Sequence, residues 1–210
     1  MRSRKDTEQP DEAVRERLMR AATELFTKKG YAATSVREIV EAAGVTKPVL
    51  YYYFGNKEGI YLKLMEEPFR RFQSLVAECR HGGGGPRERL MALFDRAFLL
   101  VLEYLEGARL MYAIYYGPPQ GAPFFDFDAY HRDFQQAVRE LVEEGVRRGE
   151  LRGENVEDML WVLVGAFNVA MEEQLCGRPD RPAGVDREGL RRMLRLILRG
   201  LSADGVEEVN

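Results

Sequence analysis

Three consecutive tyrosines flanked by two lysines carry the clearest contact chemistry in this chain. Tyr51, Tyr52 and Tyr53 each combine a flat apolar ring with a hydroxyl, and Lys47 and Lys57 lie on either side of them. Rings of this kind pack on thymine methyls and sugars, while hydroxyl and ammonium groups bind phosphate oxygens. The alternative is that the tyrosines cap a hydrophobic core at its surface. Three adjacent tyrosines cannot all point inward on a helix, so the pattern favours contact with a nucleic acid.

Two short helices joined by a tight turn are predicted to position these tyrosines. The first helix has apolar residues at helical spacing and begins at Ser35, which can form a capping box with Glu38. Gly44 ends this helix, because a residue without Cβ readily takes a left-handed conformation. Thr46 is expected to cap the second helix, and Pro48 lies in its first turn, where a missing amide proton costs little. Two helices with a short glycine-containing turn form the helix-turn-helix pattern of DNA-binding proteins.

Residues 18–64 resemble the DNA-binding domain of the TetR family of transcriptional regulators. The matching elements are a helix that ends in a Gly-Tyr turn, the helix-turn-helix itself and the start of a further helix. Two positions depart from the family pattern: Tyr53 stands where histidine is common, and Pro48 where glycine or another small residue is common. The resemblance implies double-stranded operator DNA as a partner. Together with the side-chain chemistry, it predicts DNA contacts from Thr34, Ser35, Arg37, Thr46, Lys47, Tyr51, Tyr52, Tyr53 and Lys57.

Length and charge are consistent with one small DNA-binding domain and one larger domain. A chain of 210 residues suits a helix-turn-helix domain over residues 1–58 and a helical effector-binding and dimerisation domain over residues 59–210. Residues 1–58 contain 11 Lys or Arg and 9 Asp or Glu, a net charge of +2, and the remaining residues carry −5. The first domain is only weakly basic. Binding should therefore depend on a few placed cations and on pairing two such domains.

Targeting signals and disulfides are not expected in this chain. The sequence has no apolar run of about 18 residues, and its basic start is not followed by an apolar stretch, so a cytoplasmic location is predicted. Cys79 and Cys176 lie far apart in the sequence. They are interpreted as reduced thiols in helices rather than as a disulfide or a metal-binding pair.

After the first domain the sequence predicts helices almost throughout. A helix beginning near Asn56 meets Pro68, which either ends it at Glu67 or kinks a helix that joins the two domains. Further helices are predicted over residues 86–106, 108–116, 129–148, 156–176 and 186–201.

The last two of these helices carry more apolar surface than one compact domain can cover. The resemblance implies that they form a four-helix bundle with a second copy. The predicted interface residues are Leu163, Phe167, Met171, Leu190, Leu194, Ile197 and Leu201. The alternative is that these helices only close the core of one chain.

Aromatic residues in the second domain indicate a ligand pocket. An aromatic stripe at helical spacing usually belongs to a core, but the tyrosine hydroxyls in this set need polar partners. A mostly apolar cavity with a few polar groups suits a small molecule, and the resemblance implies such an effector pocket. We expect a small hydrophobic effector. The predicted lining residues are Phe94, Phe98, Met111, Tyr112, Tyr115, Phe127, Phe134, Trp161 and Asn168.

Enzyme chemistry has little support in the sequence. The run HGGGGP at residues 81–86 lacks the lysine and the Ser or Thr of a phosphate-binding loop. Asp128 and His131 provide one imperfect metal-ligand pair with Asp126 close by, whereas a helical di-iron site needs two Glu-x-x-His motifs and two further glutamates. Either aspartate is better explained as the cap of the helix that begins near Ala129. We therefore expect no catalytic residue, metal or cofactor.

These patterns together predict an all-α homodimeric transcriptional regulator. It would repress from a palindromic operator and be released by the small hydrophobic effector. A helical-bundle enzyme, or an activator with the same DNA-binding domain, is the alternative.

Overall fold

The computed structural model describes residues 5–153, 155–177 and 184–202, and every regular element in these ranges is a helix. This confirms the all-α prediction. The helices are α1 (Lys5–Lys29), α2 (Val36–Ala43), α3 (Lys47–Phe54), α4 (Lys57–His81), α5 (Pro86–Glu103), α6 (Leu105–Tyr116), α7 (Asp128–Arg147), α8 (Val156–Leu175) and α9 (Arg187–Gly200). None of them combines the length and the apolar character needed to cross a lipid bilayer.

Two compact units make up the chain. The first, here called the head, contains the residues up to Pro68 together with residues 106–125, and the second, here called the body, contains residues 69–105 and those from 126 onward. The loop after α6 belongs to the head: the Ala32 amide donates to the Gln120 carbonyl oxygen (3.2 Å), and Gln120 Nε2 donates to the Ala113 carbonyl oxygen (3.3 Å). The functional division at residues 58 and 59 stays a prediction.

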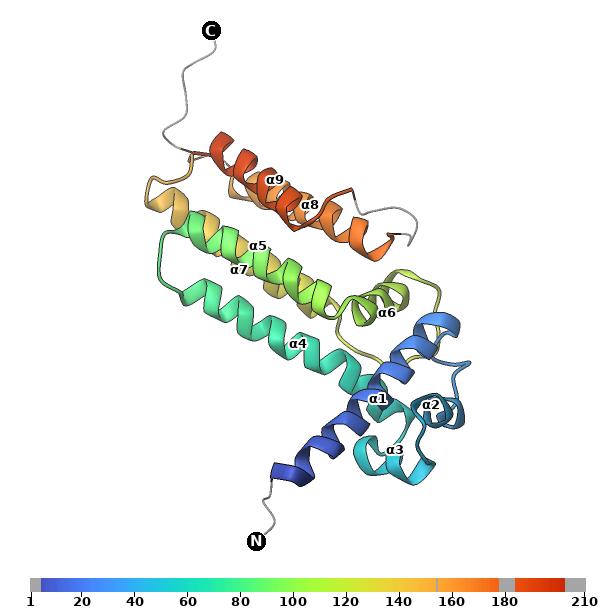
Figure 1. Cartoon of the computed structure of the whole chain (residues 1–210). Helices are drawn as coiled ribbons and strands as arrows, with labels where there is room; N and C mark the ends of the chain where they lie inside the picture. Colours follow the sequence, from blue (N-terminus) through green and yellow to red (C-terminus); the bar gives the residue numbers. More distant parts are fainter. Residues whose placement is uncertain (1–4, 154, 178–183, 203–210) are drawn as a thin grey trace. The chain divides into compact units, whose positions relative to one another are not determined.

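In the head, α1 packs against α2, and α2 lies beside α3 (Figure 1). Fully buried side chains from four helices fill the space between them, among them Leu18 and Phe26 of α1, Ile39 of α2 and Leu50 of α3. Tyr61 of α4 completes this core, and its ring lies edge-on to that of Phe26 at 6.2 Å between centroids. Burial of these apolar side chains fixes how α3 is held against the other helices.

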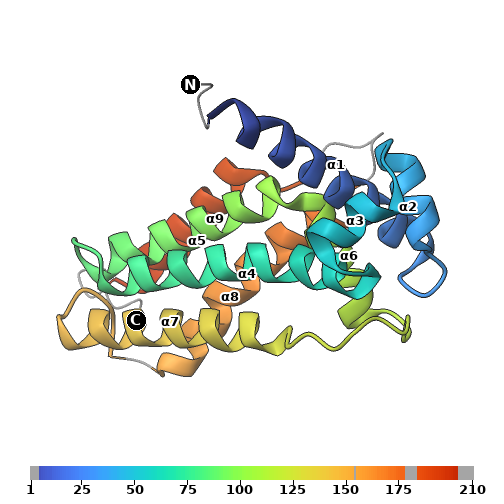
Figure 2. The ribbon, with the colours of Figure 1, turned by 90° about the horizontal axis from the view of Figure 1, so that it is seen from below.

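Helix α4 continues through Pro68 without a break, so it does not end at Glu67. In the body, α4 runs alongside α5 and α7 (Figures 1 and 2). Charged side chains join these helices: Arg80 of α4 pairs with Glu140 of α7, and Arg71 of α4 pairs with Glu103 of α5.

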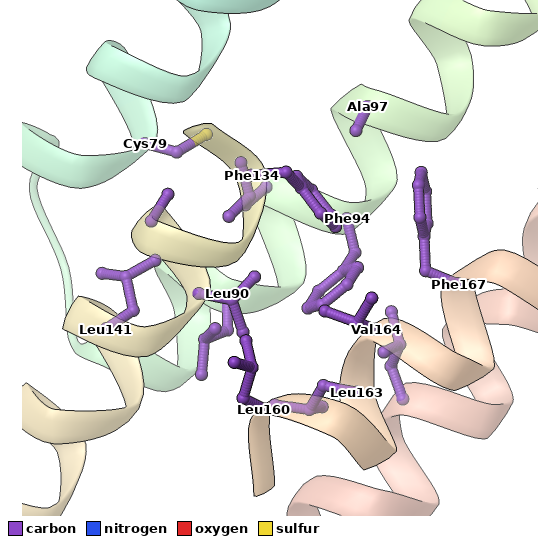
Figure 3. Packing of buried hydrophobic residues seen from close by; sticks show 14 of the residues in the cluster. Cys79, Leu90, Phe94, Ala97, Phe134, Leu141, Leu160, Leu163, Val164 and Phe167 are labelled. Carbon is purple, nitrogen blue, oxygen red and sulfur yellow. The ribbon is translucent and has the colours of Figure 1, made fainter. Parts of the chain in front are cut away.

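Helix α5 is central to the body, where it contacts α7, α8 and α9. Three phenylalanines converge at the core, Phe94 from α5, Phe134 from α7 and Phe167 from α8 (Figure 3). Their ring centroids are 5.0 to 5.7 Å apart. Pairs of this kind favour edge-on or offset packing and therefore fix the relative positions of the three helices.

Candidate nucleic-acid interface

Helix α3 presents a buried face and an exposed face. Leu50 is fully buried and Phe54 is 8% exposed, and both belong to the core of the head. Tyr51 and Tyr52 face solvent with exposed fractions of 49% and 78%. An aromatic ring this exposed gains little from the fold. Its exposure therefore agrees with a role in contact with another molecule.

Tyr53 occupies an intermediate position beside these rings. It is half-buried, and its ring meets that of Tyr52 edge-on at 5.1 Å and that of Phe54 at 6.1 Å. The ring of Tyr53 thus supports the exposed ring of Tyr52 from the side of the core. Its predicted contact with DNA stays a prediction.

The start of α3 is exposed at Thr46 and Lys47. Thr46 has the extended backbone of a cap residue, but its side chain makes no capping hydrogen bond, so that part of the prediction is wrong. Pro48 stands at the position whose amide such a hydroxyl often binds, and proline has no amide proton. The next amide, that of Val49, donates to the Thr46 carbonyl oxygen instead (3.1 Å). The Thr46 hydroxyl therefore faces solvent without a capping role.

The start of α2 confirms the predicted capping box. The Glu38 amide donates to Ser35 Oγ (3.3 Å), and Glu38 Oε2 accepts from the Ser35 amide (2.9 Å). Gly44 ends α2 with φ +65°, as expected. Lys29 also pairs with Glu38, and the hydrogen bond from Lys29, followed by those from Ser35, lowers the pKa of Glu38 to about 2. Ser35 is thus engaged within the head.

Arg37 lies on the exposed side of α2. Its side chain is 75% exposed, and its Nε pairs with Glu41 Oε1 at 2.6 Å. An exposed ion pair of this kind contributes little to stability, so it can be exchanged for a phosphate at small cost.

Thr34 is buried and Lys57 is half-buried, and both side chains donate to carbonyl oxygens of the head. Thr34 is 2% exposed, and its hydroxyl donates to the carbonyl oxygens of Gly30 (2.9 Å) and Leu25 (3.3 Å). Lys57 Nζ donates to the carbonyl oxygens of Tyr31 (3.0 Å) and Thr34 (2.9 Å). This corrects the prediction for the Thr34 side chain, which cannot reach a phosphate from this position. Sequence spacing carries no signal for these contacts, since Lys57 and Tyr31 are far apart in the chain.

The predicted effector residues fall into three groups. Phe94, Phe98 and Phe134 belong to one buried cluster in the body, and Phe127 is also buried there. A second group, on α6 in the head, consists of Met111, Tyr112 and Tyr115. The third group, Trp161 and Asn168, lies on the exposed face of α8, and Trp161 is 55% exposed. This corrects their placement, because neither side chain is enclosed by its own unit.

A groove of about 460 Å³ lies between α4 and α5 in the body. Its lining includes the apolar residues Leu75 and Leu100 and charged residues of both signs. It contains none of the predicted effector residues. The other lining residues are Arg70, Arg71, Ser74, Glu78, Arg96, Leu99 and Glu103.

The predicted dimer residues are mostly buried within one chain. Leu163 and Leu190 are fully buried and Leu194 is 1% exposed, and all three belong to the body core. Phe167 is buried as well, whereas Met171, Ile197 and Leu201 pack against this core and are partly buried. This corrects the prediction for Leu163, Phe167, Leu190 and Leu194, whose side chains are enclosed by their own chain, whereas a role for the three partly buried residues in an interface stays a prediction. The large apolar side chains that remain exposed on these helices are Trp161, Val162, Val169 and Leu196.

Asp126 binds the first turn of α7, although the N-cap of this helix is Phe127 and neither aspartate occupies that position as predicted. Its Oδ1 accepts from the Ala129 amide (3.2 Å), and its Oδ2 pairs with Arg132 (2.6 Å). Among the described residues, no group of three or more His, Cys, Asp or Glu side chains is arranged to hold a metal ion.

Two short helices, a glycine turn and an exposed tyrosine pair at the second helix define a helix-turn-helix DNA-binding protein. The family described as bacterial regulatory proteins, tetR family, matches residues 18–64. The transcriptional repressor KstR2 of Mycobacterium tuberculosis is 26% identical over 205 residues, which cover 90% of this chain and 93% of that protein. The transcriptional activator FasR of Mycolicibacterium smegmatis is 32% identical over 110 residues, 52% of this chain and 50% of that protein.

Solved structures agree with this assignment. The crystal structure of the TetR family regulator PfmR from Thermus thermophilus has a TM-score of 0.67 at 26% identity, and the match covers 88% of this chain and 98% of that one. Residues 18–64 therefore match the DNA-binding domain of the TetR family of transcriptional regulators, and the chain as a whole is similar to regulators of that family.

Proposed function

We propose that this regulator is a homodimeric repressor that binds a palindromic operator through α3 and is released by a small hydrophobic effector. One observation carries the DNA-binding part: Tyr51 and Tyr52 are exposed side by side on a helix whose opposite face is locked into the core. Tyr52 would contact base methyls and sugars, and Thr46, Lys47 and Arg37 would contact phosphates. Two heads on successive major grooves would lie roughly 34 to 36 Å apart, or a multiple of this, which requires a palindrome.

The test is the substitution Tyr52→Ala, with Tyr116→Ala as its matched control. Tyr116 is also an exposed tyrosine, at 61%, but it lies on α6 rather than on α3. Purified protein would first select its operator from random duplex DNA, and binding would then be measured by fluorescence anisotropy. We expect Tyr52→Ala to weaken operator binding about tenfold or more, and binding to scrambled DNA much less. If Tyr52→Ala binds the operator as tightly as the wild type, α3 does not read the DNA through this residue.

The faces of α8 and α9 that remain exposed support a homodimer. Trp161, Val162 and Val169 form an apolar strip on α8, and Leu196 is 74% exposed on α9. Carboxylates flank the strip on α8, whereas the exposed charges on α9 from Arg192 onward are arginines. A two-fold axis brings the same surface of each copy together, so α8 of one copy could meet α9 of the other with opposite charge. The exposed residues with these charges are Asp158, Glu172, Arg192, Arg195 and Arg199.

Repression is the favoured direction of control. The repressor KstR2 aligns along nearly the whole of this chain, whereas the activator FasR aligns along about half of it. In vitro transcription from a promoter that contains the selected operator distinguishes the two directions. A repressor lowers transcript yield as protein is added, and an activator raises it. A protein that binds operator DNA must reach the chromosome, and this supports the predicted cytoplasmic location.

The effector proposal rests on the apolar centre of the body. Phe94, Phe134 and Phe167 pack ring against ring there, so a ligand would have to displace at least one of them to enter. Such a site would favour a hydrophobic molecule over a strongly charged one. A ligand shifts an equilibrium only through its different affinities for two states, so the effector must bind operator-bound protein more weakly than free protein. Titration of candidate hydrophobic ligands against both forms tests this. Equal affinities would remove the ligand-release mechanism.

A further inference from the structure

The groove between α4 and α5, which run side by side in the body, has one face of each helix as a wall (Figures 1 and 2). Its lining residues recur at helical spacing, at positions 70, 71, 74, 75 and 78 of α4 and at positions 96, 99, 100 and 103 of α5. Its volume of about 460 Å³ lies in the range of small-molecule sites. The groove contains none of the three phenylalanines of the proposed effector site, so the two places in the body are distinct.

Two ion pairs join α4 to α5 at opposite ends of the groove. Arg71 of α4 pairs with Glu103 of α5 at one end, and Glu78 of α4 pairs with Arg96 of α5 at the other. Because Arg71 and Glu78 are seven residues apart, the two pairs are separated by about 10 Å along α4. All four side chains are exposed, and exposed ion pairs contribute little to stability. Both carboxylates of the lining are therefore already paired, and either pair can rearrange at small cost.

Between the two ion pairs the groove is apolar. Leu75 is buried, Leu100 is half-buried and Leu99 is exposed. A ligand with an apolar body that covered these leucines would remove their remaining apolar surface from water, which is favourable.

Arg70 carries the charge that the groove leaves unmatched. The lining contains three arginines and two glutamates, a net charge of +1. Each glutamate is taken by one of the other arginines, whereas Arg70 forms no ion pair within the part of the chain that the structure describes. The Ser74 hydroxyl donates to the Arg70 carbonyl oxygen (3.1 Å), so the Arg70 guanidinium is the donor that remains for a ligand. A guanidinium matches the geometry of a carboxylate and can bind it through two parallel hydrogen bonds.

We propose that this groove binds a small molecule with an apolar body and one carboxylate. The body lies on Leu75, Leu99 and Leu100, and the carboxylate pairs with Arg70. An amine in place of the carboxylate would meet the like charge of Arg70 and bind more weakly. The site is additional to the function proposed above and does not depend on repression, on the dimer or on an effector at the centre of the body.

Three probes of similar shape separate the effect of charge from that of apolar surface. Phenylbutyrate, phenylbutanol and phenylbutylamine are negative, neutral and positive at pH 7. Each is titrated into the full chain with ¹³C-labelled leucine methyl groups, and the affinity is taken from the methyl shifts. We expect phenylbutyrate to bind about threefold to tenfold more tightly than phenylbutanol, and phenylbutylamine to bind most weakly. The largest shifts should occur at Leu75, Leu99 and Leu100 and the smallest in the body core, at Leu160 and Leu163.

The substitution Arg70→Gln tests the carboxylate contact, with Arg17→Gln as its matched control. Arg17 is an exposed arginine on α1, in the head. Arg70→Gln should weaken phenylbutyrate binding about threefold to tenfold and leave phenylbutanol binding unchanged, whereas Arg17→Gln should change neither. Leu99→Asn should weaken the binding of both probes, because it removes apolar surface that they share.

Four results would overturn the proposal. Phenylbutyrate could bind no more tightly than phenylbutanol, its largest shifts could occur at Leu160 and Leu163, or its preference could survive in Arg70→Gln. The fourth is the absence of any methyl shift at millimolar probe concentrations. Arg70 and Leu99 are exposed, so both variants should fold, which circular dichroism checks. If a variant does not fold, the order of the three affinities and the position of the shifts in the wild-type protein decide the question.

Discussion

Replacing Asp95 by asparagine should loosen the attachment of α9 to α5. Asp95 Oδ1 accepts from Arg187 Nε (2.7 Å) and Arg191 Nε (2.8 Å), and Oδ2 accepts from the Nη2 atoms of the same arginines (2.7 and 2.9 Å). The carboxylate is only 13% exposed. Asparagine keeps the size of the side chain but has one acceptor oxygen and no charge, so the two guanidinium groups lose their shared partner.

The magnitude follows from the pKa of Asp95. Hydrogen bonds from Arg187, opposed by burial and aided by those from Arg191, lower this pKa from its ordinary value of 3.8 to about 2. At about 1.4 kcal/mol per pKa unit, this corresponds to roughly 2.5 kcal/mol. The arginine side chains are 39% and 30% exposed, so solvent screening reduces the expected contribution to about 1 to 2 kcal/mol. Because the folded-state pKa lies below that of the unfolded chain, the contribution is present above pH 3.8 and is lost as the pH falls through about 2.

Urea unfolding followed by circular dichroism measures this contribution at equal protein concentration. Asp95→Asn should lower the free energy of unfolding at pH 7 by about 1 to 2 kcal/mol, and the difference from wild type should shrink on acidification toward pH 3. Asp126→Asn is the matched control, because Asp126 forms an exposed pair with Arg132 and asparagine can still accept the Ala129 amide. Its effect should stay below about 0.5 kcal/mol. A difference for Asp95→Asn that is equally small, or that does not depend on pH, would refute the reasoning.

Two further pairs of substitutions test the packing. Leu194→Ala should lower the free energy of unfolding by about 2 to 5 kcal/mol because it leaves a cavity in the body core, whereas Leu196→Ala should leave the core intact and weaken self-association in sedimentation. If both substitutions lower the free energy of unfolding by similar amounts, the assignment of Leu194 to the core face and of Leu196 to the exposed face is wrong. Gly30→Ala should lower the melting temperature more than Gly44→Ala. Both glycines have positive φ, but a Cβ at Gly30 would lie 3.0 Å from Gln120 Oε1, whereas a Cβ at Gly44 would meet open space. The reverse order in calorimetry would count against the contact between Gly30 and the loop after α6.

Local chemistry allowed the helix-turn-helix to be predicted from the sequence. The capping box of Ser35 and Glu38 and the left-handed Gly44 depend on residues within one or two turns of each other. Leu50 and Phe54 are four residues apart, so they lie on one face of α3, and this spacing predicts the face that is buried. The expected cap at Thr46 is the exception, because Pro48 removes an amide that the cap could have used.

The boundary between α5 and α6 lies a few residues earlier than the sequence predicts. The sequence predicted one helix to residue 106 and the next from residue 108, whereas α5 ends at Glu103 and α6 begins at Leu105. Tyr104 between them leaves the helical conformation, and its hydroxyl accepts a hydrogen bond from Arg71 of α4 (2.6 Å). Helical periodicity continues across this point, so the sequence contains no local signal for the break.

The roles of individual side chains show where sequence information ends. Periodicity identified α8 and α9 as helices with abundant apolar surface, but it did not tell which apolar side faces the chain's own core. The neighbouring helices decide this, and they bury Leu194 and leave Leu196 exposed. In the same way, the sequence identified Lys57 as a cation near the tyrosines, whereas its partners are carbonyl oxygens in a turn more than twenty residues away. Caps and periodicity arise within a few residues along the chain, but burial and hydrogen-bond partners depend on segments that only folding brings together.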